Sequence, residues 1–197
     1  MRPIELKIKG INSYREEQVI NFSQLTSQGF FGIFGPTGSG KSTILDAITL
    51  ALYAKLPRGS KNFININESS ASVSFRFSIT TTETKEYLVE RSFRYPGKDR
   101  SSTARNTTAR LSLLSDVDTE VLADKPTDVT RSCTDLLGLS SDDFLRTVVL
   151  PQGQFSDFLK LKNQERRGML QRIFHLERYG IELTRKVAAA RQRMDIE

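Results

Sequence analysis

Gly35-Pro36-Thr37-Gly38-Ser39-Gly40-Lys41-Ser42 fits the pattern G-x-x-x-x-G-K-[ST] at every position. The apolar run at residues 29–34 precedes this octet and is typical of a strand buried on both faces. After the octet, apolar residues recur three and four positions apart from 42 to about 54, which predicts a helix. The alternative is a glycine-rich turn without function, but a chance match with both flanks in place is rare. The order strand, glycine-rich loop, helix therefore predicts a phosphate-binding loop.

Each residue type in this loop has a chemical reason. Glycines let consecutive backbone N–H groups curl around a phosphate, and the start of the helix points its positive end at the same phosphate. Lys41 reaches the β- and γ-phosphates, the Ser42 hydroxyl ligates Mg²⁺, and Thr43 is placed to contact the α-phosphate. We predict ATP with Mg²⁺ as the ligand, bound by residues 35–43, namely Gly35, Pro36, Thr37, Gly38, Ser39, Gly40, Lys41, Ser42 and Thr43.

Strands are predicted on both sides of the loop. Residues 72–79 show the clearest alternation of apolar and polar positions, and the other predicted strands are 4–8, 18–22, 87–93, 110–114 and 120–123. The segment 96–108 is rich in Ser, Thr, Arg and Gly and predicts a long loop. Several strands in a row suggest an antiparallel meander beside the nucleotide core, so we expect an α/β fold with a mixed sheet.

The last third of the sequence has a helical texture. Residues 127–150 are predicted helical with an interruption at Gly138, 151–154 form a loop, and a long helical tract starts near 163. Apolar positions alternate four and three apart within this tract, at Leu176, Gly180, Leu183, Val187, Ala190 and Met194. This heptad spacing suggests the start of a coiled coil, with an ordinary amphipathic helix as the alternative. We predict a lobe over 1–160 and a helix leading into a coiled coil over 161–197.

ATP hydrolysis needs an acidic residue at the end of a second apolar strand. The nearest match is Tyr87-Leu88-Val89-Glu90, whose pattern is that of an ordinary strand. The apolar run 147–150 is followed by Pro151 and Gln152 instead of an acidic residue. The helical tract also runs to Glu197 without a capping glycine or proline. We therefore expect the N-terminal part of a split ATPase, inactive by itself.

Composition excludes several classes of protein. Lys and Arg number 29 against 23 Asp and Glu, so the net charge is +6, and no apolar run approaches the ~18 residues of a membrane span. The single cysteine, Cys133, excludes an internal disulfide and indicates a reducing cytosol. The single histidine, His175, excludes the common zinc clusters and leaves little room for Ser/His/Asp hydrolysis.

Positive charge is concentrated in two segments. Residues 91–110 hold six basic side chains against Asp99, and residues 160–197 hold ten against five acidic ones. The six are Arg91, Arg94, Lys98, Arg100, Arg105 and Arg110. Such segments suit phosphate contacts along a DNA duplex, independent of base sequence, although solvated loop and helix faces would have the same composition.

Motifs spread over nearly the whole chain resemble the N-terminal lobe of the SbcC family, the bacterial SMC-like DNA-repair ATPases. The matching residues are 6–14 (LKIKGINSY), 35–43, 45–48 (LDAI), 51–53 (ALY), 57–59 (PRG), 121–125 (VLADK) and 150–155 (LPQGQF). Archaeal and eukaryotic relatives carry an arginine near the end of the first strand, where this chain has Asn12.

The resemblance implies an ABC-type head made of an N-terminal and a C-terminal lobe, joined by a long antiparallel coiled coil. It implies that Gln152 of the Q-loop contacts Mg²⁺ and the attacking water, which makes Lys41 and Gln152 the catalytic residues of this lobe and Ser42 and Gln152 its metal contacts. It further implies these partners: the C-terminal lobe, a second head that closes on two ATP molecules, an SbcD-type nuclease and double-stranded DNA ends. The implied location is the cytoplasm, at the nucleoid and away from membranes.

Three alternatives share the phosphate-binding loop. A chromosome-organising SMC protein would have the loop and the coiled coil but no nuclease partner. A small-molecule kinase would be compact and would complete its own catalytic set. An ABC transporter subunit is disfavoured by the coiled-coil pattern and by the strands before the loop. The interpretation that fits best is the ATP-binding half of a head that controls a DNA-repair nuclease by ATP-dependent engagement on DNA ends.

Overall fold

The computed structural model describes residues 1–26, 29–56, 62–97, 102–115, 118–149, 162–173, 185–188 and 191. The chain divides into two compact units, Met1–Leu137 and Gly138–Glu197. The first unit contains the phosphate-binding loop. The predicted boundary near residue 160 between lobe and coiled-coil helix remains a prediction.

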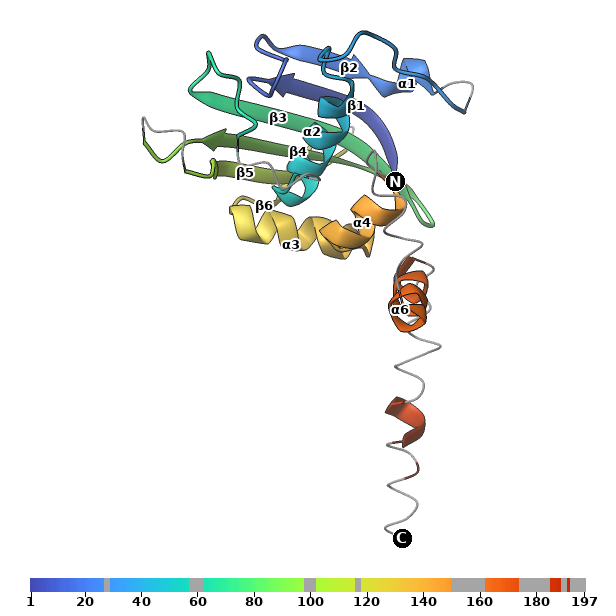
Figure 1. The fold of residues 1–197 in the computed structure, drawn as a ribbon. Coiled ribbons are helices and arrows are strands. Elements are labelled where there is room, and N and C mark those ends of the chain that lie inside the picture. Colours follow the sequence, from blue (N-terminus) through green and yellow to red (C-terminus); the bar gives the residue numbers. More distant parts are fainter. Residues whose placement is uncertain are drawn as a thin grey trace. The chain divides into compact units, whose positions relative to one another are not determined.

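A six-stranded antiparallel sheet forms the body of the first unit (Figure 1). Its order is β2-β1-β3-β4-β5-β6. The strands are β1 (Arg2–Lys9), β2 (Gln18–Asn21), β3 (Ser70–Thr80), β4 (Thr84–Arg94), β5 (Arg105–Leu114) and β6 (Thr119–Ala123). Six of the seven strands predicted from the sequence are present, and β3 to β6 form the expected meander. β5 begins at Arg105, inside the segment predicted as a loop.

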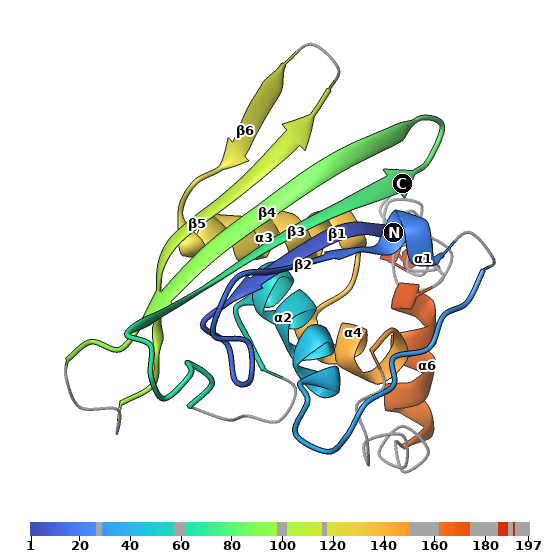
Figure 2. The ribbon, with the colours of Figure 1, turned by 90° about the horizontal axis from the view of Figure 1, so that it is seen from above.

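One face of the sheet carries the core because its side chains alternate in burial. Along β3, Val73, Phe75 and Phe77 are buried, and the intervening residues lie toward the other face. Helices α2 (Lys41–Tyr53) and α3 (Pro126–Leu137) pack on the apolar face, as the two views in Figures 1 and 2 show. A short helix, α1 (Phe22–Leu25), follows β2 and contacts β1. Cys133 of α3 is fully buried, a small apolar residue of the core.

The strand predicted at residues 29–34 is wrong. These residues have no regular secondary structure, and Phe30 and Phe34 are 82% and 93% exposed. A strand buried on both faces needs a neighbouring strand and a cover on each face. The part of the chain that the structure describes provides neither for this segment, and its sheet is antiparallel throughout rather than mixed.

The second unit contains α4 (Ser141–Thr147) and α6 (Asn163–Ile173). The predicted interruption is confirmed: α3 ends at Leu137, and Gly138 has the left-handed φ of 66° that often follows a helix. Ser140 then caps α4, because its Oγ accepts the N–H of Asp143 at 3.2 Å. Of the six heptad positions only Val187 is described, within a helical segment at 185–188. None of the described helices is long and apolar enough to cross a membrane.

Candidate nucleotide-binding site

The phosphate-binding loop ends in an uncapped helix N-terminus. Gly38 and Gly40 have left-handed φ angles of 84° and 90°, which side chains disfavour. Gly40 is the N-cap of α2 and makes no side-chain hydrogen bond to the first turn. Space around Gly38 is open, since an added Cβ would meet nothing within 4 Å. The Thr43 N–H donates to the Gly40 carbonyl at 2.9 Å, and the N-terminus of α2, which has no side-chain cap, presents the positive end of the helix dipole to an anion.

Lys41 holds its ammonium at the loop. Its Nζ donates to the carbonyl oxygens of Gly35 and Pro36, each at 2.7 Å. The next residue, Ser42, is exposed, whereas Thr43 is buried. A nucleotide phosphate with Mg²⁺ requires a cation, an accessible hydroxyl and a helix N-terminus without a side-chain cap, because Mg²⁺ takes few protein ligands beside phosphate oxygens. These residues therefore fit Mg²⁺·ATP.

A turn after β1 packs on the loop. In this turn the Ser13 hydroxyl donates to the carbonyl of Gly38 at 2.7 Å, and Asn12 Nδ2 donates to Thr43 Oγ1 at 3.3 Å. The ring of Tyr14 lies against Gly40, and partial burial raises the pKa of its hydroxyl above the usual value. Asn12 occupies a left-handed conformation, with φ of 46°, that asparagine tolerates better than most residues. Side chains of the turn after β1 thus contact both the phosphate-binding loop and the first turn of α2.

The loop before β3 fixes this turn in place. The N–H of Asn12 donates to the Phe63 carbonyl at 2.8 Å, and the N–H of Asn65 donates to the Gly10 carbonyl at 2.8 Å. Asn65 Nδ2 also donates to the Asn12 carbonyl at 2.5 Å, and Arg15 pairs with Glu68 at 3.0 Å. Sequence reasoning did not find this arrangement. The only signal was that residues 6–14 belong to the motifs of the resemblance, since the contacts join residues 25 to 53 positions apart.

Substituting Gly40 by alanine tests the contact with Tyr14. The new Cβ would lie 2.7 Å from Tyr14 Cε2, so the ring has to move, and the left-handed backbone adds strain. We expect the free energy of unfolding to fall by about 2 kcal/mol, measured by urea denaturation. Gly38→Ala is the matched control, because it has a similar φ but open space. Equal losses in the two variants would contradict the packing of Tyr14 on the loop.

Other predicted residues lie elsewhere. Gln152 and the rest of the Q-loop are outside the described residues, as are Lys98 and Arg100. Arg91, a candidate DNA contact by sequence, is only 2% exposed and faces the helices, so that part of the expectation is wrong. Strand alternation places its side chain inward. The remaining described arginines of that segment are exposed: Arg94, Arg105 and Arg110.

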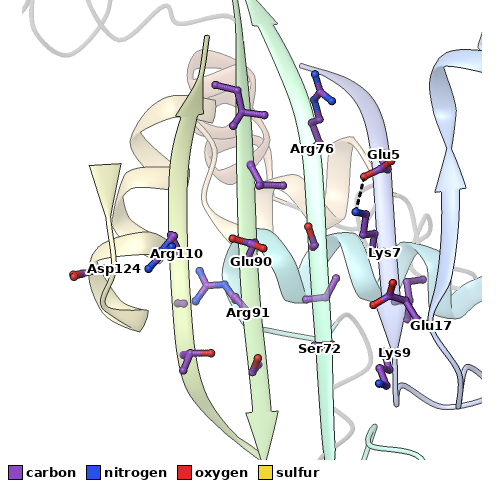
Figure 3. Close-up of a pocket in the computed structure, with 18 residues that line it drawn as sticks. Glu5, Lys7, Lys9, Glu17, Ser72, Arg76, Glu90, Arg91, Arg110 and Asp124 are labelled. Atoms are coloured by element: carbon purple, nitrogen blue, oxygen red, sulfur yellow. Dashed lines mark ion pairs between the residues drawn. The ribbon is translucent and has the colours of Figure 1, made fainter. Parts of the chain in front are cut away.

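The opposite face of the sheet is polar. A shallow groove of about 790 Å³ runs across β1, β3, β4 and β5, on the side away from α2 (Figure 3). Its basic side chains alternate with acidic ones: Lys7 pairs with Glu5 at 3.4 Å, and Arg110 lies opposite Glu90 in the strand register. Mixed charge of this kind is unlike the continuous positive surface that duplex DNA favours.

An α2 without a side-chain cap and a glycine loop with Lys41 and Ser42, beside an antiparallel sheet, define the class of site as a P-loop. The fold matches a chain from a structural study of ATP-driven dimerization and DNA-stimulated activation of SMC ATPases. The TM-score is 0.55 at 22% identity, over 88% of this chain and 99% of that one.

The chain belongs to the AAA domain family, which matches residues 5–196. It is 53% identical to the SbcC subunit of the nuclease SbcCD from Clostridium acetobutylicum and 51% identical to the same subunit from Bacillus subtilis, over 95% of this chain and 16% of each relative. A "Probable DNA double-strand break repair Rad50 ATPase" of Aquifex aeolicus is 34% identical over 96% of this chain and 18% of the relative. The resemblance to the N-terminal lobe of the SbcC family is confirmed. The chain spans about a sixth of the length of these relatives, 16% to 18%.

Proposed function

We propose that the chain is the ATP-binding half of an SMC-like head that controls a DNA-repair nuclease by closing on ATP at DNA ends. The observation that carries this proposal is the loop at residues 35–43. The N-terminus of α2 without a side-chain cap, the Lys41 cation and the hydroxyls of the loop fit a nucleotide phosphate, and the turn after β1 contacts the loop through Asn12 and Ser13. The names of the similar proteins support the nuclease and DNA-repair parts.

Each residue of the loop has one role in this mechanism. The amides at the start of α2 bind the phosphates, and Lys41 leaves the carbonyls of Gly35 and Pro36 to neutralise the β- and γ-oxygens. Thr43, held by Asn12, contacts the α-phosphate. The Ser42 hydroxyl and Gln152 would hold the Mg²⁺, and a bound Mg²⁺ would supply Lewis-acid stabilisation of negative charge on the phosphate oxygens. Gln152 also orients the attacking water.

A C-terminal lobe completes the site in this proposal. After Lys41 the sequence offers no good match to an apolar strand that ends in an acidic residue, as hydrolysis needs, and the apolar side chains of residues 30–34 are exposed. A strand from a C-terminal lobe, paired beside residues 29–34, would cover this segment and restore the predicted buried strand. The same strand could bring the acidic residue next to Lys41 and Ser42.

The remaining partners follow the resemblance. Two heads enclose two ATP molecules, an SbcD-type nuclease docks at the coiled-coil base, and DNA ends are the substrate of the complex in the bacterial cytoplasm at the nucleoid. Exposed basic side chains on the described parts of 91–110 and 160–197 suit phosphate contacts. A chromosome-organising SMC protein is the second candidate, favoured only by the fold match. Co-purification of a metal-dependent nuclease would separate the two.

ATP turnover with Mg²⁺ tests the split head. We expect no turnover by this chain alone and measurable turnover after mixing with the C-terminal lobe, because each lobe holds part of the catalytic set. Gln152→Ala should abolish turnover in the mixture, with Gln164→Ala, an exposed glutamine of α6, as the control. Robust turnover by the isolated chain would place a catalytic acid within these residues and overturn the split.

A further inference from the structure

Arg91 is a buried cation behind the phosphate-binding helix. It lies on β4 at 2% exposure, and its side chain reaches the end of α2 opposite to Lys41. A guanidinium has five N–H groups, and each of those of Arg91 has an acceptor. One of the acceptors is Asn106 Oδ1, with the side-chain amide of Asn106 oriented so that its nitrogen donates to Ser92 O and Thr108 O. The acceptors are Ala51 O (2.6 Å), Leu52 O (3.2 Å), Thr130 Oγ1 (3.0 Å), Pro126 O (3.3 Å) and Asn106 Oδ1 (2.6 Å).

All five acceptors are neutral, so dipoles rather than a carboxylate balance the charge. Ala51 and Leu52 belong to the last turn of α2, where carbonyl groups lack intrahelical donors and carry the negative end of the helix dipole. Burial lowers the pKa of Arg91 to about 10, which leaves it protonated at neutral pH. Burial also raises the pKa of the nearby Cys133 thiol to about 11, so Cys133 is neutral.

We propose that Arg91 is a positioning residue of the nucleotide site, because it fixes the tilt and rotation of the helix that presents Lys41, Ser42 and Thr43. This inference rests on the proposed function. Two consecutive carbonyls at the end of α2 accept from one planar guanidinium, which belongs to β4 and also donates to Pro126 and Thr130 in the first two turns of α3.

The helix carries this constraint to the loop. It has 13 residues and is about 20 Å long, a rigid element over that distance. A change of tilt at Leu52 therefore moves the first-turn amides at the other end relative to the turn that holds Ser13 and Asn12. A side chain that only filled the core would stabilise the fold without this effect on the loop.

The test compares nucleotide affinity with stability in the full-length protein. Titrations with the fluorescent analogue mant-ATP and Mg²⁺ give the dissociation constant, and thermal unfolding gives Tm. The variants are Arg91→Met and Arg91→Lys, the latter keeping the charge but losing the planar set of donors. Val89→Ala is the core control, since Val89 is fully buried on the same face of β4. Lys85→Met, which removes an exposed cation from the same strand, is the surface control.

We expect Arg91→Met to weaken mant-ATP binding about tenfold and Arg91→Lys to fall between it and the wild type. Val89→Ala should lower Tm while it changes affinity by less than about twofold. If Arg91→Met does not fold, the mant-ATP affinity of Arg91→Lys tests the inference. Wild-type affinity in the Arg91 variants would overturn the inference and leave the proposed function standing, whereas a wild-type protein that binds no mant-ATP would overturn the proposed function itself.

Discussion

Replacing Lys41 by alanine is expected to lower the affinity of the full-length protein for Mg²⁺·ATP by about 100-fold, as lost charge-assisted hydrogen bonds to the β- and γ-phosphates imply. The free protein should keep its stability. Lys41 Nζ donates to the carbonyls of Gly35 and Pro36 in an exposed loop, and water replaces those hydrogen bonds. The measurements are a mant-ATP titration and thermal unfolding.

A lysine remote from the loop is the control for this prediction. Lys85 lies exposed on β4, and Lys85→Ala removes the same charge from the protein as a whole. A loss of affinity shared by both variants would indicate general electrostatic attraction rather than a specific contact. Undiminished binding by Lys41→Ala would exclude residues 35–43 as the phosphate site.

Gly10→Ala is expected to destabilise the protein more than Gly40→Ala. We expect the free energy of unfolding, measured by urea denaturation, to fall by about 3 kcal/mol. Gly10 is buried with φ of 68°, and an added Cβ would overlap the Ser70 carbonyl oxygen and lie 3.2 Å from Ala71 Cα. Both contacts are backbone atoms at the start of β3, which cannot rotate away as a side chain does.

Gly97→Ala is the matched control, because Gly97 is exposed and an added Cβ meets nothing within 4 Å. The stability of that variant should stay within about 0.5 kcal/mol of the wild type. Gly10 also begins the turn that holds Ser13 and Asn12 against the loop, so Gly10→Ala should weaken mant-ATP binding as well. A stable Gly10→Ala variant would contradict the close approach of β1 and β3.

The elements with strong periodicity could be predicted from the sequence. Six of the seven predicted strands are present, as are helices α2 and α3, because alternation and helical spacing report which side of an element is buried. Their bounds lie close to the predicted ones except in β5, which begins at Arg105 instead of 110. The same alternation also contains the signal for Arg91. Arg91 occupies an inward position of β4, between the buried residues Val89 and Phe93. For this reason the prediction that it belongs to a charged surface segment is wrong.

Residues 29–34 show the limit of this reasoning. Their apolar composition predicts burial. A strand is buried only where other strands or helices cover it, and the sequence of the strand itself does not show which ones do. The described residues leave Phe30 and Phe34 exposed. An apolar composition therefore indicates that a segment is buried in the complete protein, not which segment covers it. We propose that a C-terminal lobe covers residues 29–34.

Local sequence contains the residues of the proposed site: glycines where the backbone turns left-handed, a lysine and hydroxyls suited to phosphate and Mg²⁺, and a helix directed at them. Long-range contacts in the folded chain hold these residues in place. Asn12, Ser13 and Tyr14 meet the loop from 25 to 31 positions away, and Arg91 meets the end of α2 from 40 positions away. Such contacts arise because the pairing of β1, β3 and β4 brings distant segments to one helix, and no local periodicity encodes that pairing.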